Sequence, residues 1–144
     1  MKTEKLLQEL LADLMKINVN IHNLHWNVTG MGFEEYHELT EEFYNDVFEK
    51  YDDVAEILKT NGLFPVASLA AYDKASGIKD IEPKDFSDEE VLKEVKAIYD
   101  YLKAKFIEIR EVAVEADEFG VANVMEGYIG DYSKKLWMIN ARLK

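Results

Sequence analysis

Apolar residues recur every three or four positions along four long stretches of the chain. The stretches cover roughly 3–28, 33–60, 87–117 and 120–143. This spacing places the apolar side chains of each stretch on one face of an α-helix. The line expected to be buried in the second stretch is Phe33, Tyr36, Tyr44, Val47, Tyr51, Val54 and Leu58. The pattern therefore predicts four amphipathic helices.

Glycine and proline separate the four stretches, and the second connection is much longer than the first. Gly30 and Gly32 mark a tight turn, whereas about 25 residues follow the second stretch. Residues 66–76 within that connection are expected to form a short helix. A connection long enough to cross a bundle favours the ferritin-like arrangement over the simple up-down-up-down one. We therefore expect an all-α, ferritin-like four-helix bundle with a short helix in the crossover between helices 2 and 3.

Composition narrows the class of protein. The chain has 144 residues, no cysteine and a formal charge of -12. The length predicts a single domain over 1–144, and the missing cysteines exclude disulfides, thiolate zinc sites and a cysteine nucleophile. No apolar run reaches the length of a membrane span and no signal peptide is evident, so a cytoplasmic protein is expected. The acidity argues against nucleic-acid binding and favours cations or basic molecules as partners.

Histidines and carboxylates on the second predicted helix form a candidate metal-ligand set. His37 and Glu41, and again Asp52 and Glu56, are spaced four residues apart, so each pair can share an ion. Solvated charge is the competing interpretation of each acid taken alone. Glu41 and Asp52 lie roughly 16 Å apart along the helix, so one chain cannot bring both pairs to one ion.

A symmetric pair of chains can bring together the two candidate ligand pairs that lie far apart within one chain. Glu34 to His37 is the only Glu-x-x-His string, and no histidine follows it, so the sequence argues against an internal di-iron site. Two second helices placed antiparallel across a two-fold axis near residues 46–47 bring His37 and Glu41 of one chain opposite Asp52 and Glu56 of the other. His25 lies on the flank of the first helix's apolar line and can join that interface site.

The motifs resemble those of a known family. The sequence reads His25-Trp26-Asn27-Val28-Thr29-Gly30, then Phe33, His37-Glu38, Asp52-Asp53-Val54-Ala55-Glu56, Gly62 and Pro65, and closes with Lys134-Lys135-Leu136-Trp137-Met138-Ile139-Asn140-Ala141. This pattern, which covers essentially the whole chain, is similar to that of the Dps family, the miniferritins also called DNA-binding proteins from starved cells.

The resemblance implies a site shared between chains in a hollow homododecamer. The first iron is expected on His25 of one chain with Asp52 and Glu56 of the other, and the second near His37 and Glu41. Zinc or manganese is expected to substitute for iron. Trp26 resembles the family's radical-quenching aromatic, with ordinary packing as the alternative. Three outward acids are candidates for mineral nucleation or for a merely solvated face: Glu38, Glu42 and Glu49.

The resemblance also implies an activity. A ferroxidase is expected, an oxidoreductase that oxidises ferrous iron with hydrogen peroxide in preference to oxygen, stores ferric mineral and protects against oxidative stress. The alternatives are a nucleoid-binding stress protein with secondary ferroxidase activity and a non-enzymatic bundle with an incidental metal site. The short tails and the negative charge argue against DNA binding and nucleoid association.

A few positions depart from the family pattern or lie outside it. Glu41 stands where the family often has Asp, and Ile57 where Arg is common. His22 is expected to be a surface residue or to support the site from behind. Gly127 and Gly130 are interpreted as places of close helix packing. Asp117 and Glu118 are candidates for lining a pore through which iron passes.

Overall fold

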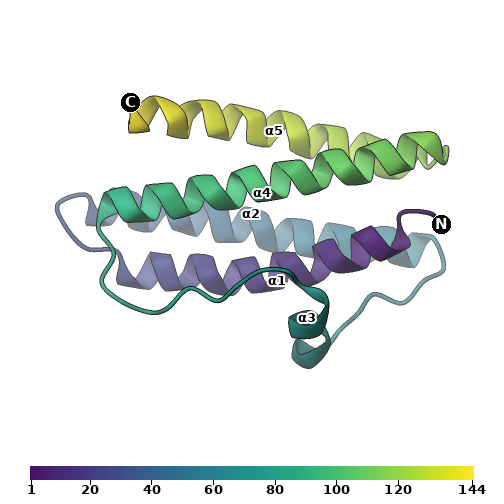
Figure 1. Cartoon of the computed structure of the whole chain (residues 1–144), viewed down its shortest axis with the longest axis horizontal. Coiled ribbons are helices and arrows are strands. Elements are labelled where there is room, and N and C mark those ends of the chain that lie inside the picture. The colour runs from purple at the N-terminus through teal and green to yellow at the C-terminus, as the bar shows by residue number, and fades with distance from the viewer. The chain divides into compact units, whose positions relative to one another are not determined.

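The computed structural model describes all residues, 1–144, and its regular elements are helices. Their bounds are α1 Glu4–Asn27, α2 Phe33–Thr60, α3 Leu69–Ala75, α4 Asp88–Glu115 and α5 Phe119–Leu143 (Figure 1). The four long helices and the short helix in the second connection confirm the elements predicted from the apolar spacing. None of the helices combines the length and the apolar character needed to cross a membrane.

The chain divides into two compact units. One consists of residues 8–91, and the other of residues 1–7 together with 92–144. The single-domain organisation predicted from the length stays a prediction.

In the unit of residues 8–91, α1 and α2 form an antiparallel pair joined by a tight turn (Figure 1). Gly30 in this turn has φ 104°, a conformation that side-chain-bearing residues rarely adopt. Apolar residues that recur every three or four positions through α1, together with Val28 just after it, are all buried: Leu10, Leu14, Ile17, Ile21, Leu24 and Val28. The Asn18 side-chain amide donates a hydrogen bond of 2.9 Å to the Tyr44 carbonyl, which fixes the pair in register.

The buried face of α2 differs in part from the predicted one. Its buried residues are Thr40, Phe43, Val47, Lys50, Val54 and Leu58. Phe33, which was expected inside, is 41% exposed because it is the first residue of the helix and extends past the end of the buried face. The Lys50 ammonium lies 2.7 Å from the Asp46 carboxylate, which compensates for the burial of its charge.

The connection that follows α3 runs back along α1 and is held there by buried polar side chains. The Asn20 amide donates to the Lys79 carbonyl at 2.9 Å, and Asn23 bonds in the same way to the carbonyl two residues further on. The Asp13 carboxylate accepts the Ser76 hydroxyl at 2.5 Å. These bonds satisfy backbone groups that have no secondary-structure partner. The crossover is therefore fixed along α1.

In the other unit, α4 and α5 form a second antiparallel pair. The Tyr99 and Tyr132 rings meet edge to face with centroids 4.6 Å apart, and the Arg110 guanidinium lies 3.1 Å from the Glu126 carboxylate. The predicted close packing at Gly127 and Gly130 is wrong for this chain, because a Cβ at either position would have nothing within 4 Å. Spacing within one helix does not reveal what faces it.

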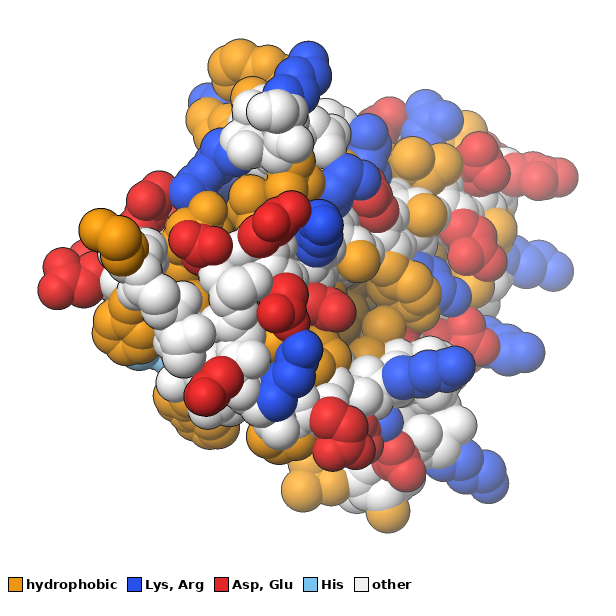
Figure 2. Space-filling model, turned by 60° about the vertical axis from the view of Figure 1, so that its left-hand side comes forward, with side chains coloured by type: hydrophobic (Ala, Val, Ile, Leu, Met, Phe, Trp, Pro, Cys, Tyr) orange, Lys and Arg blue, Asp and Glu red, His pale blue; other side chains and the backbone are white.

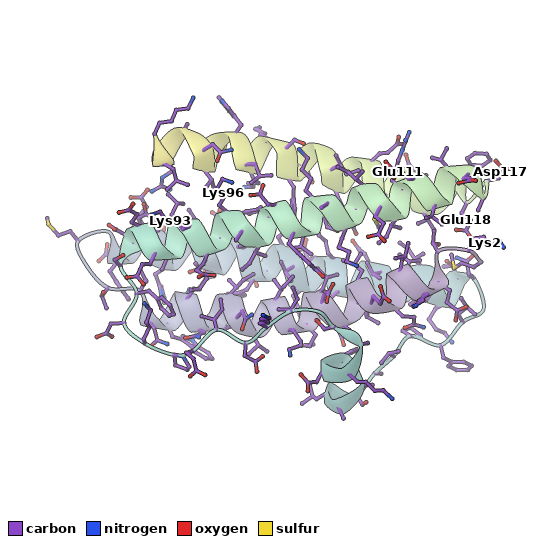
Figure 3. The ribbon with its side chains drawn as sticks, viewed as in Figure 1. Lys2, Lys93, Lys96, Glu111, Asp117 and Glu118 are labelled. Carbon is purple, nitrogen blue, oxygen red and sulfur yellow. The ribbon has the colours of Figure 1, made fainter.

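The turn between α4 and α5 anchors the N-terminal residues. The Glu118 carboxylate accepts hydrogen bonds from the backbone N–H groups of Lys2 and Thr3, at 2.5 and 3.2 Å, and from the Thr3 hydroxyl at 2.8 Å. Figure 3 shows Lys2, Asp117 and Glu118 at the same end of α4. The Glu118 oxygens, proposed from sequence for a pore, are thus engaged within the chain.

Asp117 ends α4 in the left-handed region, with φ 58°. A residue with a Cβ pays a conformational cost there that glycine avoids. We expect Asp117→Gly to raise the free energy of unfolding by about 0.5–1 kcal/mol, measured by chemical denaturation. Asp117→Ala removes the same carboxylate but keeps the Cβ, so it should give no gain; a gain of equal size would assign the effect to the charge instead.

Candidate metal centre

Two histidines face each other beside the turn between α1 and α2. The rings of His25 on α1 and His37 on α2 are stacked, with centroids 3.6 Å apart and planes inclined by 18°. His25 Nδ1 lies 2.7 Å from the His37 carbonyl oxygen, and His37 Nδ1 lies 2.9 Å from the His25 carbonyl oxygen. Each ring is therefore bonded to the backbone of the other residue in a crossed arrangement.

The crossed bonds decide which ring nitrogen can bind a metal. A carbonyl oxygen only accepts hydrogen bonds, so both Nδ1 atoms carry the proton. In the neutral rings the lone pair is then on Nε2, the atom that a metal would use. Metal-binding histidines commonly show this pattern, with the second nitrogen bonded to a carbonyl or carboxylate. The donor atoms fit a divalent first-row metal such as ferrous iron.

The turn positions the two rings opposite each other. Phe86, from the end of the crossover, lies beside the turn, where its carbonyl accepts from the Thr29 N–H at 2.8 Å and its N–H donates to the Asn27 carbonyl at 3.0 Å. These two bonds hold the chain where α1 ends and the turn begins, which limits how far the end of α1 can move.

Thr40 belongs to the site, although the sequence analysis did not single it out. It is fully buried, and its hydroxyl oxygen lies 3.1 Å from His25 Nδ1. A threonine on the inner face of a helix, three residues after a candidate ligand, is the signal that could have indicated it.

Aromatic rings surround the histidine pair. Phe33 stacks on the other side of His37, with centroids 5.1 Å apart. His22 is half-buried, donates from Nδ1 to the Asn18 carbonyl at 2.8 Å, and stacks on Tyr44 with ring centroids 3.9 Å apart. As a carbonyl only accepts, His22 is the donor. Its ring centroid lies 6.4 Å from that of His25, and a role in supporting the site stays a prediction.

The carboxylates predicted as ligands are exposed on α2 and are not all gathered at the histidines. Glu41 lies near the pair, with its carboxylate 3.5 Å from the Tyr44 hydroxyl. Asp52 and Glu56 are three to four turns further along the same helix. No group of three or more His, Asp or Glu side chains within the chain is placed to hold a metal ion. The assignment of these carboxylates as ligands stays a prediction.

The remaining candidates lie on the surface. Trp26 is 68% exposed, and its ring centroid is 5.4 Å from that of His22. The candidate nucleation acids are all exposed on α2: Glu38, Glu42 and Glu49. Little histidine surface is visible on the face drawn in Figure 2.

Comparison with known proteins places this geometry in a family. The family model of the ferritin-like domain matches residues 4–144. The DNA protection during starvation protein of Brevibacillus brevis is 32% identical over 139 residues, covering 96% of this chain and 93% of that protein. The chain belongs to the Dps family. Antigen TpF1 of Treponema pallidum is 33% identical over 138 residues, with 96% of this chain and 78% of that protein covered.

A solved structure agrees with the Dps assignment. The Dps protein of Vibrio cholerae O1, described as a member of a broad superfamily of ferritin-like diiron-carboxylate proteins, superposes with a TM-score of 0.91 at 32% identity. The match covers 96% of this chain and 87% of that one. The all-α fold predicted from the sequence, a ferritin-like four-helix bundle with a short helix in the crossover, is confirmed for this Dps chain.

Burial lowers the pKa of His25 below its ordinary value of about 6.5. The unfolded chain then takes up a proton at a higher pH than the folded Dps chain. The stability due to neutral His25 is present above about pH 6.5 and is lost as the pH falls through the lower pKa of the folded protein. Metal-free wild type should therefore lose more unfolding free energy between pH 7.5 and 5.5 than His25→Gln, as measured by urea denaturation. Equal losses in the two proteins would contradict this.

Proposed function

We propose that this Dps protein is an iron-storage and detoxification miniferritin. It oxidises ferrous iron, preferentially with hydrogen peroxide, at di-iron centres shared between subunits, and stores ferric mineral inside a dodecameric shell. It acts in the cytoplasm against oxidative stress. The observation that carries the proposal is the crossed histidine pair, because both Nε2 atoms are available to a metal beside an acidic helix. Membership of the ferritin-like family supports iron handling.

The proposed centre takes ligands from two chains. One iron binds His25 of one chain with Asp52 and Glu56 of a second copy, and the other binds near His37 and Glu41. In this proposal Glu56 would also contribute its carboxylate to the second iron. The separation of these residues within one chain supports a shared site, since only a second copy can bring the missing carboxylates close to the histidines.

The donor set suits the proposed reaction. Anionic carboxylates stabilise ferric iron more than ferrous iron, because the ferric ion carries the higher charge. Two ferrous ions at one centre supply the two electrons that reduce one peroxide to water, so no hydroxyl radical need be released. Zinc or manganese can bind to the same nitrogen and oxygen donors without taking part in this reaction.

Two departures from the Dps pattern bear on the centre. Glu41 carries one methylene more than the Asp often found there, which places its carboxylate further from α2. Ile57 is half-buried and has no charge, so an ion pair that an Arg could make is missing. We propose that the first change alters the geometry of the second iron position.

The shell provides a role for the outer acids. We propose that Glu38, Glu42 and Glu49 face the cavity and nucleate the mineral, and that Trp26 quenches radicals that escape the centre. Exposure of all four side chains in the single chain is compatible with both roles.

Nucleoid binding is the alternative function, favoured by the name of the relatives as DNA protection proteins. The charge of this chain opposes it. A dodecamer would carry about -144, twelve times the -12 of one chain. Acidic and basic side chains are interspersed on the face drawn in Figure 2. Lys93 and Lys96 lie toward the opposite end of α4 from Glu111 (Figure 3).

Mixed oligomers test whether the centre is shared. His25→Ala and Asp52→Ala oligomers should each lose most peroxide-dependent oxidation of ferrous iron. In a pair made of one chain of each kind, one of the two sites receives wild-type His25 and wild-type Asp52. Co-refolded equimolar chains should therefore recover about a quarter of the wild-type rate, because about half of the pairs are mixed.

The matched control is Asp53→Ala, which removes a neighbouring exposed carboxylate about 100° away on α2. Asp53→Ala oligomers should retain peroxide-dependent oxidation of ferrous iron. When Asp53→Ala chains are mixed with His25→Ala chains, the activity should not exceed what the Asp53→Ala chains contribute themselves. Mixed His25→Ala and Asp52→Ala oligomers that stay inactive would contradict the shared centre. Oxidation as fast in Asp52→Ala as in wild type would contradict the ligand assignment.

DNA binding is tested by gel shift at neutral pH and low salt, where electrostatic attraction is strongest. We expect no retardation of plasmid DNA, because the net charge of the protein repels phosphate. A basic DNA-binding protein in the same gel serves as the positive control. Clear retardation that disappears with added salt would favour the alternative function.

A further inference from the structure

Thr40 has a hydroxyl in a place where a packing residue needs none. Its side chain is fully buried, with 0% solvent exposure, in the first half of α2. Its Oγ1 lies 2.8 Å from the Tyr36 carbonyl and 3.0 Å from the His37 carbonyl, both in the preceding turn. Donation to either carbonyl satisfies the hydroxyl proton. The oxygen lone pairs remain available to accept a hydrogen bond.

The His25 ring supplies the donor for that lone pair. His25 Nδ1 lies 2.7 Å from the His37 carbonyl oxygen and 3.1 Å from Thr40 Oγ1. One N–H therefore points between two oxygens. A single acceptor lets an imidazole pivot about the hydrogen bond, whereas two acceptors on either side restrict the direction of the N–H. Nε2 is across the ring from Nδ1, so its direction is restricted at the same time.

We propose that Thr40 is a positioning residue that directs the Nε2 lone pair of His25 toward the metal. It contacts no metal and acts only through the imidazole. The inference rests on the proposed role of His25 as a ligand, and it adds a determinant of metal affinity that already exists in the single, metal-free chain. Removing a partner of this kind commonly weakens metal binding about 10–100-fold.

The chain contains a matched control. Thr60 lies in the last turn of the same helix, is exposed, and donates its hydroxyl to the Ile57 carbonyl at 2.8 Å. It shares the bond to the preceding turn but has no histidine beside it. Thr→Val at the two positions removes the same hydroxyl from the same helix, and only the change at Thr40 removes an acceptor from His25.

The experiment titrates Co²⁺ into iron-free wild type and variants and follows both binding heat and the visible spectrum. We expect Thr40→Val and Thr40→Ala to weaken Co²⁺ binding at the His25 site about 10-fold. Thr40→Ser, which keeps the hydroxyl, should stay within about threefold of wild type, and Thr60→Val should match it. In the metal-free proteins, ¹⁵N NMR should show faster exchange of the His25 Nδ1 proton in Thr40→Val and Thr40→Ala only.

Each outcome decides the proposal. Wild-type affinity and proton exchange in folded Thr40→Ala or Thr40→Val would overturn it, as would an equal loss in Thr40→Ser or in Thr60→Val. Co²⁺ binding that is unchanged by His25→Ala would overturn it together with the ligand assignment. Failure of the proposed function is a separate result, since it appears as absent ferrous oxidation in wild type while the order of Co²⁺ affinities remains.

Discussion

The pairing of α1 with α2 at their connecting turn is the constraint on which the candidate site depends. Ring nitrogens on each helix bond to the backbone of the other, so the two helices are fixed through groups that no substitution of a neighbouring side chain removes. Phe86 braces the turn from the side of the crossover. A slide of one helix past the other would break both crossed bonds together, and with them the common orientation of the two Nε2 atoms.

Burial and charge divide the site into two kinds of donor. The His25 imidazole is inside the fold, where burial lowers its pKa, whereas the carboxylates of Glu41, Asp52 and Glu56 are exposed to water. Carboxylates left in solvent carry no desolvation cost until a cation or a second chain covers them. The single chain thus orients the two histidine rings of the candidate site and leaves exposed the carboxylates that are proposed to act with a second copy.

Helix periodicity was sufficient to predict the helices. Because one face of α1 and one face of α4 are buried, apolar residues recur along each of them every three or four positions. The periodicity was insufficient at Phe33, where the face ends, and at Gly127, where a Cβ would have nothing within 4 Å. The histidines could be selected by residue type and spacing. Thr40 and the crossed bonds could not, because their partners are backbone carbonyls, which every residue possesses and which only the fold brings within reach.

The bonds that Glu118 makes to the backbone of Lys2 and Thr3 also govern how the chain can be labelled or joined to other molecules. A segment attached at Met1 leaves the protein beside the turn between α4 and α5, whereas one attached at Lys144 leaves from the far end of α5. The two attachment points are separated by the length of a 25-residue helix, about 37 Å. Probes placed at the two termini therefore report on opposite ends of the same helical pair.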